Sequence, residues 1–428
     1  MLVDYGRAIV GGYMEDLRKL ISSEWENRKE KSEELKIPLS AITYGVDEIM
    51  EVLDSMLSAQ VTMGKKVGTF ERMFADYIGV KHGIMVNSGS SANLIAMSLL
   101  TNPVFKNRIK KGSEVITPAV TWSTTVFSII HAGLRPLLID VDEDYLIDIE
   151  KLKESIGPKT KAILLVHLLG NPCDMKAIMD IAQDHKLFLI EDCCEAHGAE
   201  YRDKKVGSFG DISTYSFYFS HHITTIEGGI VLTNDDMFAD LSRIFRAHGW
   251  IREVSNREEL IKKYSDIDPR FLFVNIGHNL RPTDLQGAIG IHQMNRLEGF
   301  IKIRRENAEF WNKSLKKYED SFILPKERDG TRHTWLAYPL TIRHEANFTR
   351  KQLIEFLESK NIKTRPIVAG NMSEQPALRF FKHKETGLKN SEYIMRNSFY
   401  IGNHQEIRHR ERQYFVECMD GFMSNIKS

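Results

Sequence analysis

The chain has 428 residues and a formal net charge of zero, because 58 Lys and Arg residues balance 58 Asp and Glu residues. Hydrophobic residues make up 42% and charged residues 27%, which is typical of globular proteins and excludes a disordered chain. Balanced charge gives no electrostatic basis for binding nucleic acid or an anionic membrane surface. The length allows more than one domain and a large buried core.

The number of cysteines and the N-terminal sequence indicate the cellular compartment in which the protein works. Four cysteines are too few and too unevenly spaced for a disulfide scaffold, which favours a reducing environment. The N-terminus lacks the basic start and apolar core of a signal peptide. Two long uncharged stretches, 83–105 and 115–134, contain proline and several Ser, Thr or Asn residues, which argues against membrane-spanning helices. We therefore expect a cytoplasmic protein, of the size of an enzyme, that does not associate with membranes.

The first part of the chain is predicted to be helical. Residues 14–36 are rich in charge and predict an exposed or interface helix. From about residue 44 to 77, apolar residues recur at three- and four-residue spacing and predict a second helical stretch. We assign residues 1–37 to an N-terminal helical extension.

Short apolar runs then alternate with amphipathic helices. The predicted strands are 83–86, 115–117, 137–140, 161–165 and 187–190. This alternation predicts crossover connections and a mostly parallel sheet covered by helices on both faces. We expect an α/β fold in which residues 38–290 form a large domain and residues 291–428 form a smaller C-terminal domain.

The segment NSGSSAN, residues 87–93, follows the first predicted strand and opens a helix. Its small residues allow close approach of a ligand, and the amide groups of a helix start bind anions, so Gly89, Ser90 and Ser91 are candidates for binding a phosphate. An ordinary N-cap is the alternative, since Ser and Asn are common there.

Asp192 ends the run LFLIED, at the carboxyl end of a predicted central strand. Open α/β sheets bind ligands in the crevice beyond such strand ends, and a carboxylate there could hold a protonated ring nitrogen. The alternative is an acid that only caps the next turn. The neighbouring Cys193 and Cys194 fit core packing better than chemistry, because successive strand residues point to opposite faces.

A strand-like aromatic run that starts at Ser216 ends in His221 and His222, followed by a polar turn and a Gly pair. Two adjacent histidines could suggest a metal. Their side chains diverge, however, and no nearby His, Cys and carboxylate spacing resembles a known ligand set. We expect no metal site.

Five motifs occur in one order along the chain: NSGSSAN, TWSTT, EDCCEAHGA, GDISTYSFYFSHHITTIEGG and NLRPTDLQGAIG. Over residues 38–428 this order and spacing resembles the DegT/DnrJ/EryC1/StrS sugar aminotransferase family. The resemblance implies the fold-type-I aminotransferase fold, with a mostly parallel seven-stranded sheet between helices and a smaller α/β domain. It also implies an enzyme that uses pyridoxal 5'-phosphate on nucleotide-linked keto-sugars.

One position departs from the aminotransferase pattern. Where the aminotransferases have a lysine that holds the cofactor covalently, this chain has His221. An imidazole has no primary amine, so the cofactor, as pyridoxal or pyridoxamine 5'-phosphate, would be bound non-covalently. Histidine takes and gives protons near neutral pH, and a dehydratase branch of the family carries the same exchange.

The dehydratase branch implies a specific reaction. L-Glutamate supplies an amino group, the C3 hydroxyl of a nucleotide-linked 4-keto-6-deoxy sugar leaves with the help of His221, and ammonia is released. The product is a 4-keto-3,6-dideoxy sugar. A GDP-linked hexose is our first choice of substrate, and the corresponding heptose or a CDP-linked sugar stays open. The implied active unit is a homodimer with a shared active site.

The resemblance also implies the remaining site residues. Those expected to contact the cofactor are Gly89, Ser90, Ser91, Trp122, Asp192, Glu195, Ser216 and Asn279. The glycine and the three serines hold the phosphate, the tryptophan stacks on the ring, the aspartate pairs with the ring nitrogen, and the glutamate helps to position the ring. The asparagine reaches the phosphate of the neighbouring subunit. Substrate candidates, from the motifs RAHGW and RPIVAGN, are Arg246, His248, Arg365 and Asn371.

Two other functions are open from the sequence. A sister branch of dehydratases takes electrons from a reductase through an iron–sulfur cluster, three of whose cysteines follow the RAHGW-like segment. Residues 251–274 contain no cysteine, so we expect no such cluster. A non-catalytic relative that binds the cofactor as a regulatory module would need a DNA-binding domain or a basic face, and the sequence supplies neither. Formation of ammonia would distinguish the enzyme from this module.

Overall fold

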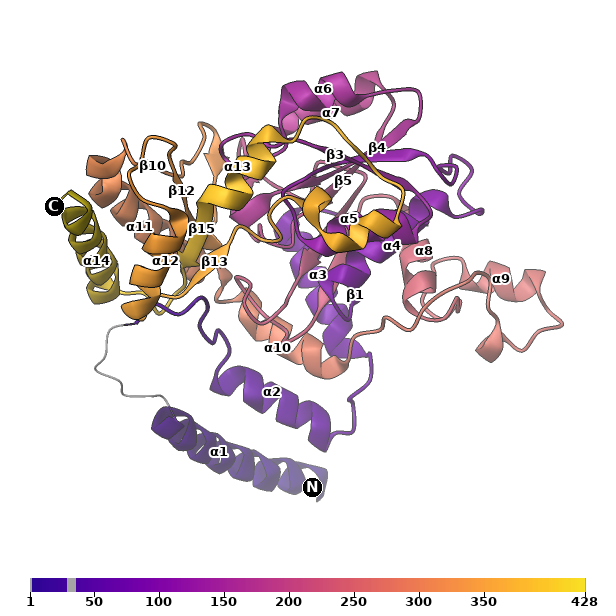
Figure 1. Ribbon diagram of the computed structural model, residues 1–428. Coiled ribbons are helices and arrows are strands. Elements are labelled where there is room, and N and C mark those ends of the chain that lie inside the picture. Colours follow the sequence, from indigo (N-terminus) through magenta and orange to yellow (C-terminus); the bar gives the residue numbers. More distant parts are fainter. Residues whose placement is uncertain (1, 29–35, 428) are drawn as a thin grey trace.

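A large sheet and a small sheet lie side by side with helices around them, in a computed structural model that describes residues 2–28 and 36–427 (Figure 1). The large sheet has eight strands. In spatial order they are β1 (His82–Val86), β9 (Gly229–Thr233), β8 (Ile212–Ser216), β5 (Phe188–Asp192), β4 (Thr160–Val166), β2 (Glu114–Pro118), β3 (Arg135–Ile139) and β14 (Lys384–Glu385). Only β9 runs antiparallel to its neighbours, which confirms the mostly parallel sheet.

The strand β14 was not predicted. Seven strands were expected, and this eighth one comes from the C-terminal part of the chain, where Lys384 and Glu385 pair with β3 at the sheet edge. Both residues are charged and exposed. No apolar run therefore marks this strand in the sequence.

Successive side chains of each strand enter two different cores, as expected for a sheet covered on both faces. In β4, Ala162 and Leu164 enter one core and Ile163 and Leu165 enter the other. The first core is covered by α4 (Gly89–Thr101), α5 (Ser123–His131) and α8 (Asp236–Arg246). The second face is covered by α6 (Ile149–Ser155), α7 (Met175–Asp184) and α3 (Lys65–Ile78).

The N-terminal helical predictions need correction. The first helix, α1 (Leu2–Arg28), starts earlier than residue 14, and the predicted part from 29 to 35 lies outside the described residues. The stretch 44–77 is two helices, α2 (Val46–Leu57) and α3, and not one. The break is fixed by Gly64, the N-cap of α3, whose amide donates to Asp284 Oδ1 at 3.1 Å.

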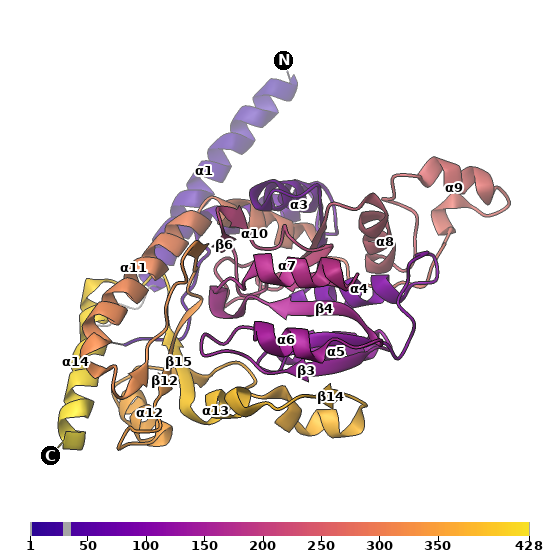
Figure 2. The same cartoon turned by 90° about the horizontal axis from the view of Figure 1, so that it is seen from above.

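The small sheet is antiparallel and lies beside the large one (Figure 2). Its strands are β10 (Phe322–Ile323), β12 (Ala337–Ile342), β15 (Ser398–Gly402) and β13 (Thr364–Pro366). The helices of this part are α11 (Leu297–Leu315), α12 (Arg350–Ser359), α13 (Lys389–Asn397) and α14 (His409–Lys427). Its core is aromatic, with Trp311 packed against Tyr338 and Phe415.

Three further elements complete the chain. α10 (Asp284–Met294) packs against α2 and α3, and α9 (Arg257–Lys263) projects from the rest of the molecule in both views (Figure 1; Figure 2). A third sheet consists of β11 (Thr331–Arg332), β6 (Glu200–Tyr201) and β7 (Lys204–Lys205). Within the described ranges, no helix combines the length and the hydropathy needed to span a lipid bilayer.

Candidate active site

The candidate residues gather at one edge of the large sheet. Strands β1, β8, β5 and β2 point the same way, so their carboxyl ends share that edge. β5 ends at Asp192, β8 ends at Ser216, and α4 begins at Gly89, three residues after the end of β1. Trp122 follows β2 as the N-cap of α5. In open α/β sheets, this edge is where ligands bind.

The start of α4 lies against the end of β8. A methyl group on Gly89 would lie 2.5 Å from Ser216 Cβ and 3.1 Å from Cys194 Sγ, so only glycine allows this approach. Ser88 caps the helix by accepting from the Ser91 amide at 3.1 Å. Ser90 is exposed at the same helix start. The structure thus places Ser216 against the helix N-terminus and leaves Ser90 exposed there, which fits an anion, whereas the Ser91 hydroxyl donates to Asn87 Oδ1 at 2.6 Å.

Asp192 is buried and held by three hydrogen bonds. Its Oδ2 accepts from Asn93 Nδ2 at 2.8 Å and from Thr125 Oγ1 at 2.9 Å, while Oδ1 accepts from the Cys194 amide at 3.2 Å. Thr214 Oγ1 in turn donates to Asn93 Oδ1 at 2.6 Å. These bonds fix the direction in which the carboxylate faces the sheet edge. The support from Thr125 and Thr214 was not predicted.

Glu195 lies three residues after Asp192, and most of its surface is buried. Its Oε2 accepts from the Leu169 amide at 2.8 Å. Burial raises the pKa of Glu195 to about 7; the Leu169 amide opposes this rise and the charge of Asp192 adds to it. Leu169 has a positive φ of 54° within the motif LLGNP, so that motif shapes a turn that orients Glu195. The carboxyl group can therefore hold or release a proton near neutral pH.

His221 lies in a loop and not at the end of a strand, which corrects the strand-like interpretation of this segment. β8 ends at Ser216. Phe217 then closes a compact loop, because its amide donates to the Gly228 carbonyl at 2.8 Å and its carbonyl accepts from the Thr225 amide at 2.9 Å. Within the aromatic run the Phe217 ring is buried, whereas Tyr218 is 48% exposed.

The two histidines of this loop have different surroundings. His221 is partly exposed, and its Nδ1 is enclosed without a hydrogen-bond partner, which leaves Nε2 for a ligand. His222 is fully buried, and its Nε2 donates to the Thr334 carbonyl at 3.0 Å. The buried ring of His197 lies 6.1 Å from the His221 ring and 5.4 Å from the His222 ring. Burial, and then the positive charge of Arg304, lowers the pKa of His221 to about 4, so the imidazole is neutral at pH 7.

Trp122 and Asn279 are both open to solvent. Trp122 is 59% exposed, so its ring offers an apolar face at the sheet edge. Asn279 is exposed in the loop before α10, and its Oδ1 accepts from Arg281 Nε at 3.0 Å. The same loop exposes Phe271 and Ile276, whose exposed fractions are 62% and 86%. A stacking ligand and a partner subunit stay predictions for these two positions.

The four substrate candidates do not lie in similar surroundings. Arg246 is buried with its guanidinium 2.6 Å from Glu71 and 2.7 Å from Glu253, which argues against contact with a substrate. His248 is exposed beside the ring of Trp250, 5.5 Å away.

Arg365 and Asn371 lie where the small sheet meets the large one. Arg365 is exposed on β13, opposite Tyr400 of β15. Asn371 bridges to Val120, just after β2, and its Nδ2 is buried without a partner. Tyr400 was not predicted; burial, and then the charge of Glu195, raises the pKa of its hydroxyl to about 12.

A second cluster of polar groups has metal-ligand chemistry but is occupied by hydrogen bonds. His167, Glu191 and Cys193 lie within 4.8 Å of one another. The Cys173 amide donates to His167 Nδ1 at 3.0 Å, so Nε2 carries the hydrogen and donates to Glu191 Oε2 at 3.1 Å. Glu191 also accepts from three backbone amides of residues 207–210. The cluster therefore fixes β5 to its neighbours.

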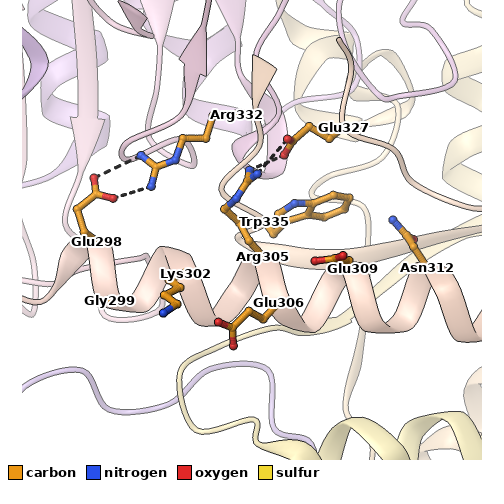
Figure 3. Close-up of a pocket in the computed structure, with 10 residues that line it drawn as sticks. All are labelled: Glu298, Gly299, Lys302, Arg305, Glu306, Glu309, Asn312, Glu327, Arg332 and Trp335. Atoms are coloured by element: carbon orange, nitrogen blue, oxygen red, sulfur yellow. Dashed lines mark hydrogen bonds and ion pairs between the residues drawn. The ribbon is translucent and has the colours of Figure 1, made fainter. Parts of the chain in front are cut away.

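A separate cavity lies away from the sheet edge. It has a volume of about 810 Å³ and runs along α11, and Figure 3 shows its lining. Two arginines that line it are paired: Arg332 contacts Glu298 at 2.5 Å and Arg305 contacts Glu327 at 2.5 Å. None of the predicted site residues lines it. We refer to it as the α11 groove.

Comparison with known proteins agrees with this geometry. The matching family model is described as the DegT/DnrJ/EryC1/StrS aminotransferase family and covers residues 43–420. The chain belongs to this family. Its architecture is the fold-type-I aminotransferase fold, as expected. The α1 helix lies outside the matched region.

Three relatives of this family member resemble it over nearly its whole length. GDP-4-keto-6-deoxy-D-mannose 3-dehydratase of Escherichia coli O55:H7 is 38% identical over 390 residues, which cover 90% of this chain and 100% of that protein. A crystal structure of GDP-4-keto-6-deoxymannose-3-dehydratase, a His-to-Asn mutant with bound GDP-perosamine, has a TM-score of 0.85 and 37% identity, covering 90% and 100% of the two chains. A structure of the dehydratase with a trapped PLP-glutamate geminal diamine has a TM-score of 0.83 and 36% identity, with coverage of 90% and 100%.

Proposed function

We propose that this protein is a pyridoxal phosphate- and glutamate-dependent C3-dehydratase of a nucleotide-linked 4-keto-6-deoxy sugar. The observation that carries the proposal is His221, an imidazole at the position where the family resemblance implies a lysine. The preferred substrate is GDP-4-keto-6-deoxy-D-mannose, because the relatives named for that substrate match this chain end to end. The corresponding heptose and CDP-linked sugars are the alternatives.

The residues at the sheet edge fit the cofactor. The Gly89 cradle and the serine hydroxyls suit a phosphate, since a side chain at position 89 would fill that space. Asp192 suits a protonated ring nitrogen, and the exposed Trp122 suits stacking on a flat ring. The position that would hold the cofactor covalently has no amine, so binding is non-covalent. When bound, the cofactor supplies an electron sink and carries an amino group between glutamate and sugar.

The protein's own residues transfer the proton that leaves carbon during the reaction. His221 is neutral at pH 7 and can accept a proton from carbon at Nε2. It can return that proton to the C3 hydroxyl, which leaves as water when the C–O bond breaks. Glu195 and Asp192 orient the reacting ring, and His222 holds the loop through Thr334. A lysine at 221 would instead support ordinary amino transfer.

The substrate enters between the two sheets in this proposal. Arg365, exposed on β13, supplies positive charge for a carboxylate or a phosphate, and the unpaired Asn371 Nδ2 supplies a donor. We also propose a homodimer in which Asn279 reaches the partner's cofactor phosphate, supported by its exposure and by the exposed Phe271 and Ile276 beside it. The proposed domains are residues 38–290 and 291–428.

Assays with a panel of substrates test the proposed function. Purified protein is mixed with pyridoxal 5'-phosphate, L-glutamate and one of three 4-keto-6-deoxy sugars: GDP-linked hexose, GDP-linked heptose or CDP-linked hexose. We expect release of ammonia, formation of 2-oxoglutarate and a sugar that lacks the C3 oxygen, fastest with the GDP-linked hexose. No turnover with any sugar, or an amino sugar as the product, would contradict the proposal.

A further inference from the structure

His197, in the loop between β5 and β6, is a buried polar side chain that the proposed reaction does not yet use. Its imidazole is 0% exposed, and neither Nδ1 nor Nε2 has a hydrogen-bond partner among the described residues. A neutral imidazole offers one donor and one acceptor, and burying both without partners is costly. Buried polar groups are nearly always satisfied by protein or by ordered water, so this ring requires a reason.

Three aromatic rings, which we call the aromatic wall, pack around His197. They belong to Phe74, Tyr215 and Phe217, are buried, and have centroids 6.1, 5.3 and 5.6 Å from the imidazole. The two phenyl rings have no conventional hydrogen-bonding atom, and the Tyr215 hydroxyl donates to the Val206 carbonyl at 2.5 Å. The aromatic wall therefore encloses the imidazole and offers it little hydrogen bonding.

The other ring neighbours of His197 are the two histidines of the site. Its ring lies 6.1 Å from the ring of His221 and 5.4 Å from the ring of His222. In both of these histidines Nδ1 is buried and has no hydrogen-bond partner within the part of the chain that the structure describes. Three imidazoles, each with an unpaired buried nitrogen, therefore lie together at the residue that moves the proton in the proposed reaction.

The hydrogen-bonding roles of these nitrogens are complementary. His222 Nε2 donates to the Thr334 carbonyl at 3.0 Å, so in the neutral ring His222 Nδ1 carries no hydrogen and accepts. A base at His221 Nε2 needs a lone pair there, which places the hydrogen of the neutral ring on His221 Nδ1. That Nδ1–H group is a donor in need of an acceptor, whereas His222 and His197 each have an unused acceptor nitrogen.

A water molecule fits between these rings, and a metal ion does not. A metal bound at about 2 Å needs donor atoms within about 4 Å of one another. Among the described residues, only the His167 cluster brings three such donor atoms within 4.8 Å. The unpaired nitrogens of the three rings also make no direct hydrogen bond with one another. Water donates and accepts at once, so it links groups too far apart for a direct bond of about 3 Å.

We propose that His197 is a positioning residue for His221 and that the two rings share a buried water molecule. The water accepts from His221 Nδ1–H and donates to the acceptor nitrogens of His197 and His222. This holds the His221 ring in the tautomer whose Nε2 lone pair is free to take a proton from carbon. The inference rests on the proposed function for its chemical meaning, because only in that reaction does Nε2 act as a base.

The pKa shifts of the three rings agree with this arrangement. Burial, and then the charge that His221 carries when protonated, lowers the pKa of His197, while the nearby backbone of Ser216 opposes the fall. Burial is also the first cause that lowers the pKa of His222 and of His221, the latter to about 4. All three imidazoles are therefore neutral at pH 7, and each has one N–H group and one acceptor nitrogen.

The tautomer of His221 separates this role from a purely structural one. It is read from the ¹⁵N chemical shifts of the two ring nitrogens in full-length protein labelled with ¹⁵N-histidine, with and without pyridoxal 5'-phosphate, and His221→Asn assigns the signals. His197→Phe keeps an aromatic ring and removes both nitrogens, whereas His197→Gln keeps an amide that can bind the water. Tyr215→Phe is the matched control, because it changes the aromatic wall but removes only the hydroxyl that bonds to Val206.

In the wild type and in Tyr215→Phe we expect His221 to carry its hydrogen on Nδ1. In His197→Phe the ratio of this tautomer to the other should fall about threefold to tenfold, as expected for loss of one hydrogen bond, and His197→Gln should restore most of it. An unchanged ratio in folded His197→Phe, or a hydrogen on Nε2 in the wild type, would overturn the inference. This readout needs no sugar substrate, so it can fail while the proposed function stands, or succeed while that function fails.

A crystal structure of the wild-type protein keeps the test decisive if His197→Phe does not fold. We expect an ordered water molecule at about 2.7–3.2 Å from both His221 Nδ1 and a ring nitrogen of His197. Electron density without a water molecule between these two rings would overturn the inference. A direct bond from His221 Nδ1 to another protein group would overturn it as well.

Discussion

The active-site edge and the α11 groove lie on two sides of the same stretch, residues 333–336, yet they differ in how their polar and charged side chains are paired. In the groove, two arginines pair with carboxylates at sites partly open to water, Arg305–Glu327 and Arg332–Glu298. At the active-site edge, Asp192 is held by hydrogen bonds, whereas His221 Nδ1 and Asn371 Nδ2 are buried without a partner among the described residues. None of the predicted site residues lines the α11 groove.

Paired surface charges and unpaired buried polar groups contribute differently to the free energy of folding. A paired surface charge contributes about 0–1 kcal/mol to stability, so a groove lined by such pairs is inexpensive to keep and says little about function. A buried polar group without a partner costs about 1–3 kcal/mol. Several such groups at one edge are retained only where a ligand or a reaction uses them.

The largest effect is expected at His221. His221→Asn should lower kcat about 10³-fold, because the group that moves the proton is lost. Binding of pyridoxal 5'-phosphate, measured by absorbance, should change little. His383→Asn, at a partly exposed histidine just before β14 at the far end of the strand order, is the control and should keep wild-type kcat. A wild-type kcat in His221→Asn would show that His221 does not move the proton and that the active-site edge differs from the α11 groove for another reason.

The next effect tests the phosphate cradle. Gly89→Ala places a methyl group 2.5 Å from Ser216 Cβ, and this overpacking should cost about 2–3 kcal/mol of stability and weaken cofactor binding at least about tenfold. Thermal unfolding and cofactor titration measure both. Gly157→Ala is the matched control, since no atom lies within 4 Å of its added methyl group. Equal cofactor affinity in the two variants would show that position 89 does not face the phosphate.

A smaller effect concerns pH and Glu195. The pKa of its carboxyl rises from 4.5 to about 7 on folding, so the folded protein holds this proton more tightly than the unfolded chain. Stability should therefore fall as pH rises from about 5 to about 8, by about 2 kcal/mol from this group. Glu195→Gln should lose that part of the dependence in urea unfolding at the two pH values. Identical slopes for variant and wild type would show that Glu195 ionises as an ordinary carboxyl.

The smallest effect is expected in the α11 groove. Glu327→Gln should change the free energy of unfolding by less than about 1 kcal/mol and leave kcat unchanged, because its partner Arg305 is partly exposed to water. Urea unfolding and steady-state kinetics at 0.1 M and 1 M salt would measure this. A loss of activity here would mean that the groove takes part in the reaction and that the contrast between the regions is wrong.

Sequence patterns predicted the central strands and the residues at their ends, because apolar runs and terminal polar residues depend on local chain order. Asp192 and Gly89 are of this kind. Thr125 and the Leu169 amide could not be found, since a threonine in a helix and a backbone amide have no distinctive pattern. Arg304 and Arg305 are identical neighbours in sequence, and only packing decides which one is buried.

Arg246 shows the reverse error. Its place in the motif RAHGW suggested a substrate contact, but the pattern could not reveal Glu71, 175 residues away, which pairs with it. Long-range ion pairs of this kind are set by tertiary structure. The strand β14 escaped prediction for the same reason, since its pairing with β3 depends on the path of the C-terminal segment.

The most direct test of the proposed function follows the nitrogen atom that glutamate supplies. With ¹⁵N-glutamate, pyridoxal 5'-phosphate and GDP-4-keto-6-deoxy-D-mannose, NMR can follow the label during turnover by the wild-type protein. The imidazole at position 221 predicts that the label appears as free ammonium, one for each sugar that loses its C3 oxygen. Label retained on C4 of a sugar that keeps its C3 hydroxyl would identify an aminotransferase and contradict the account.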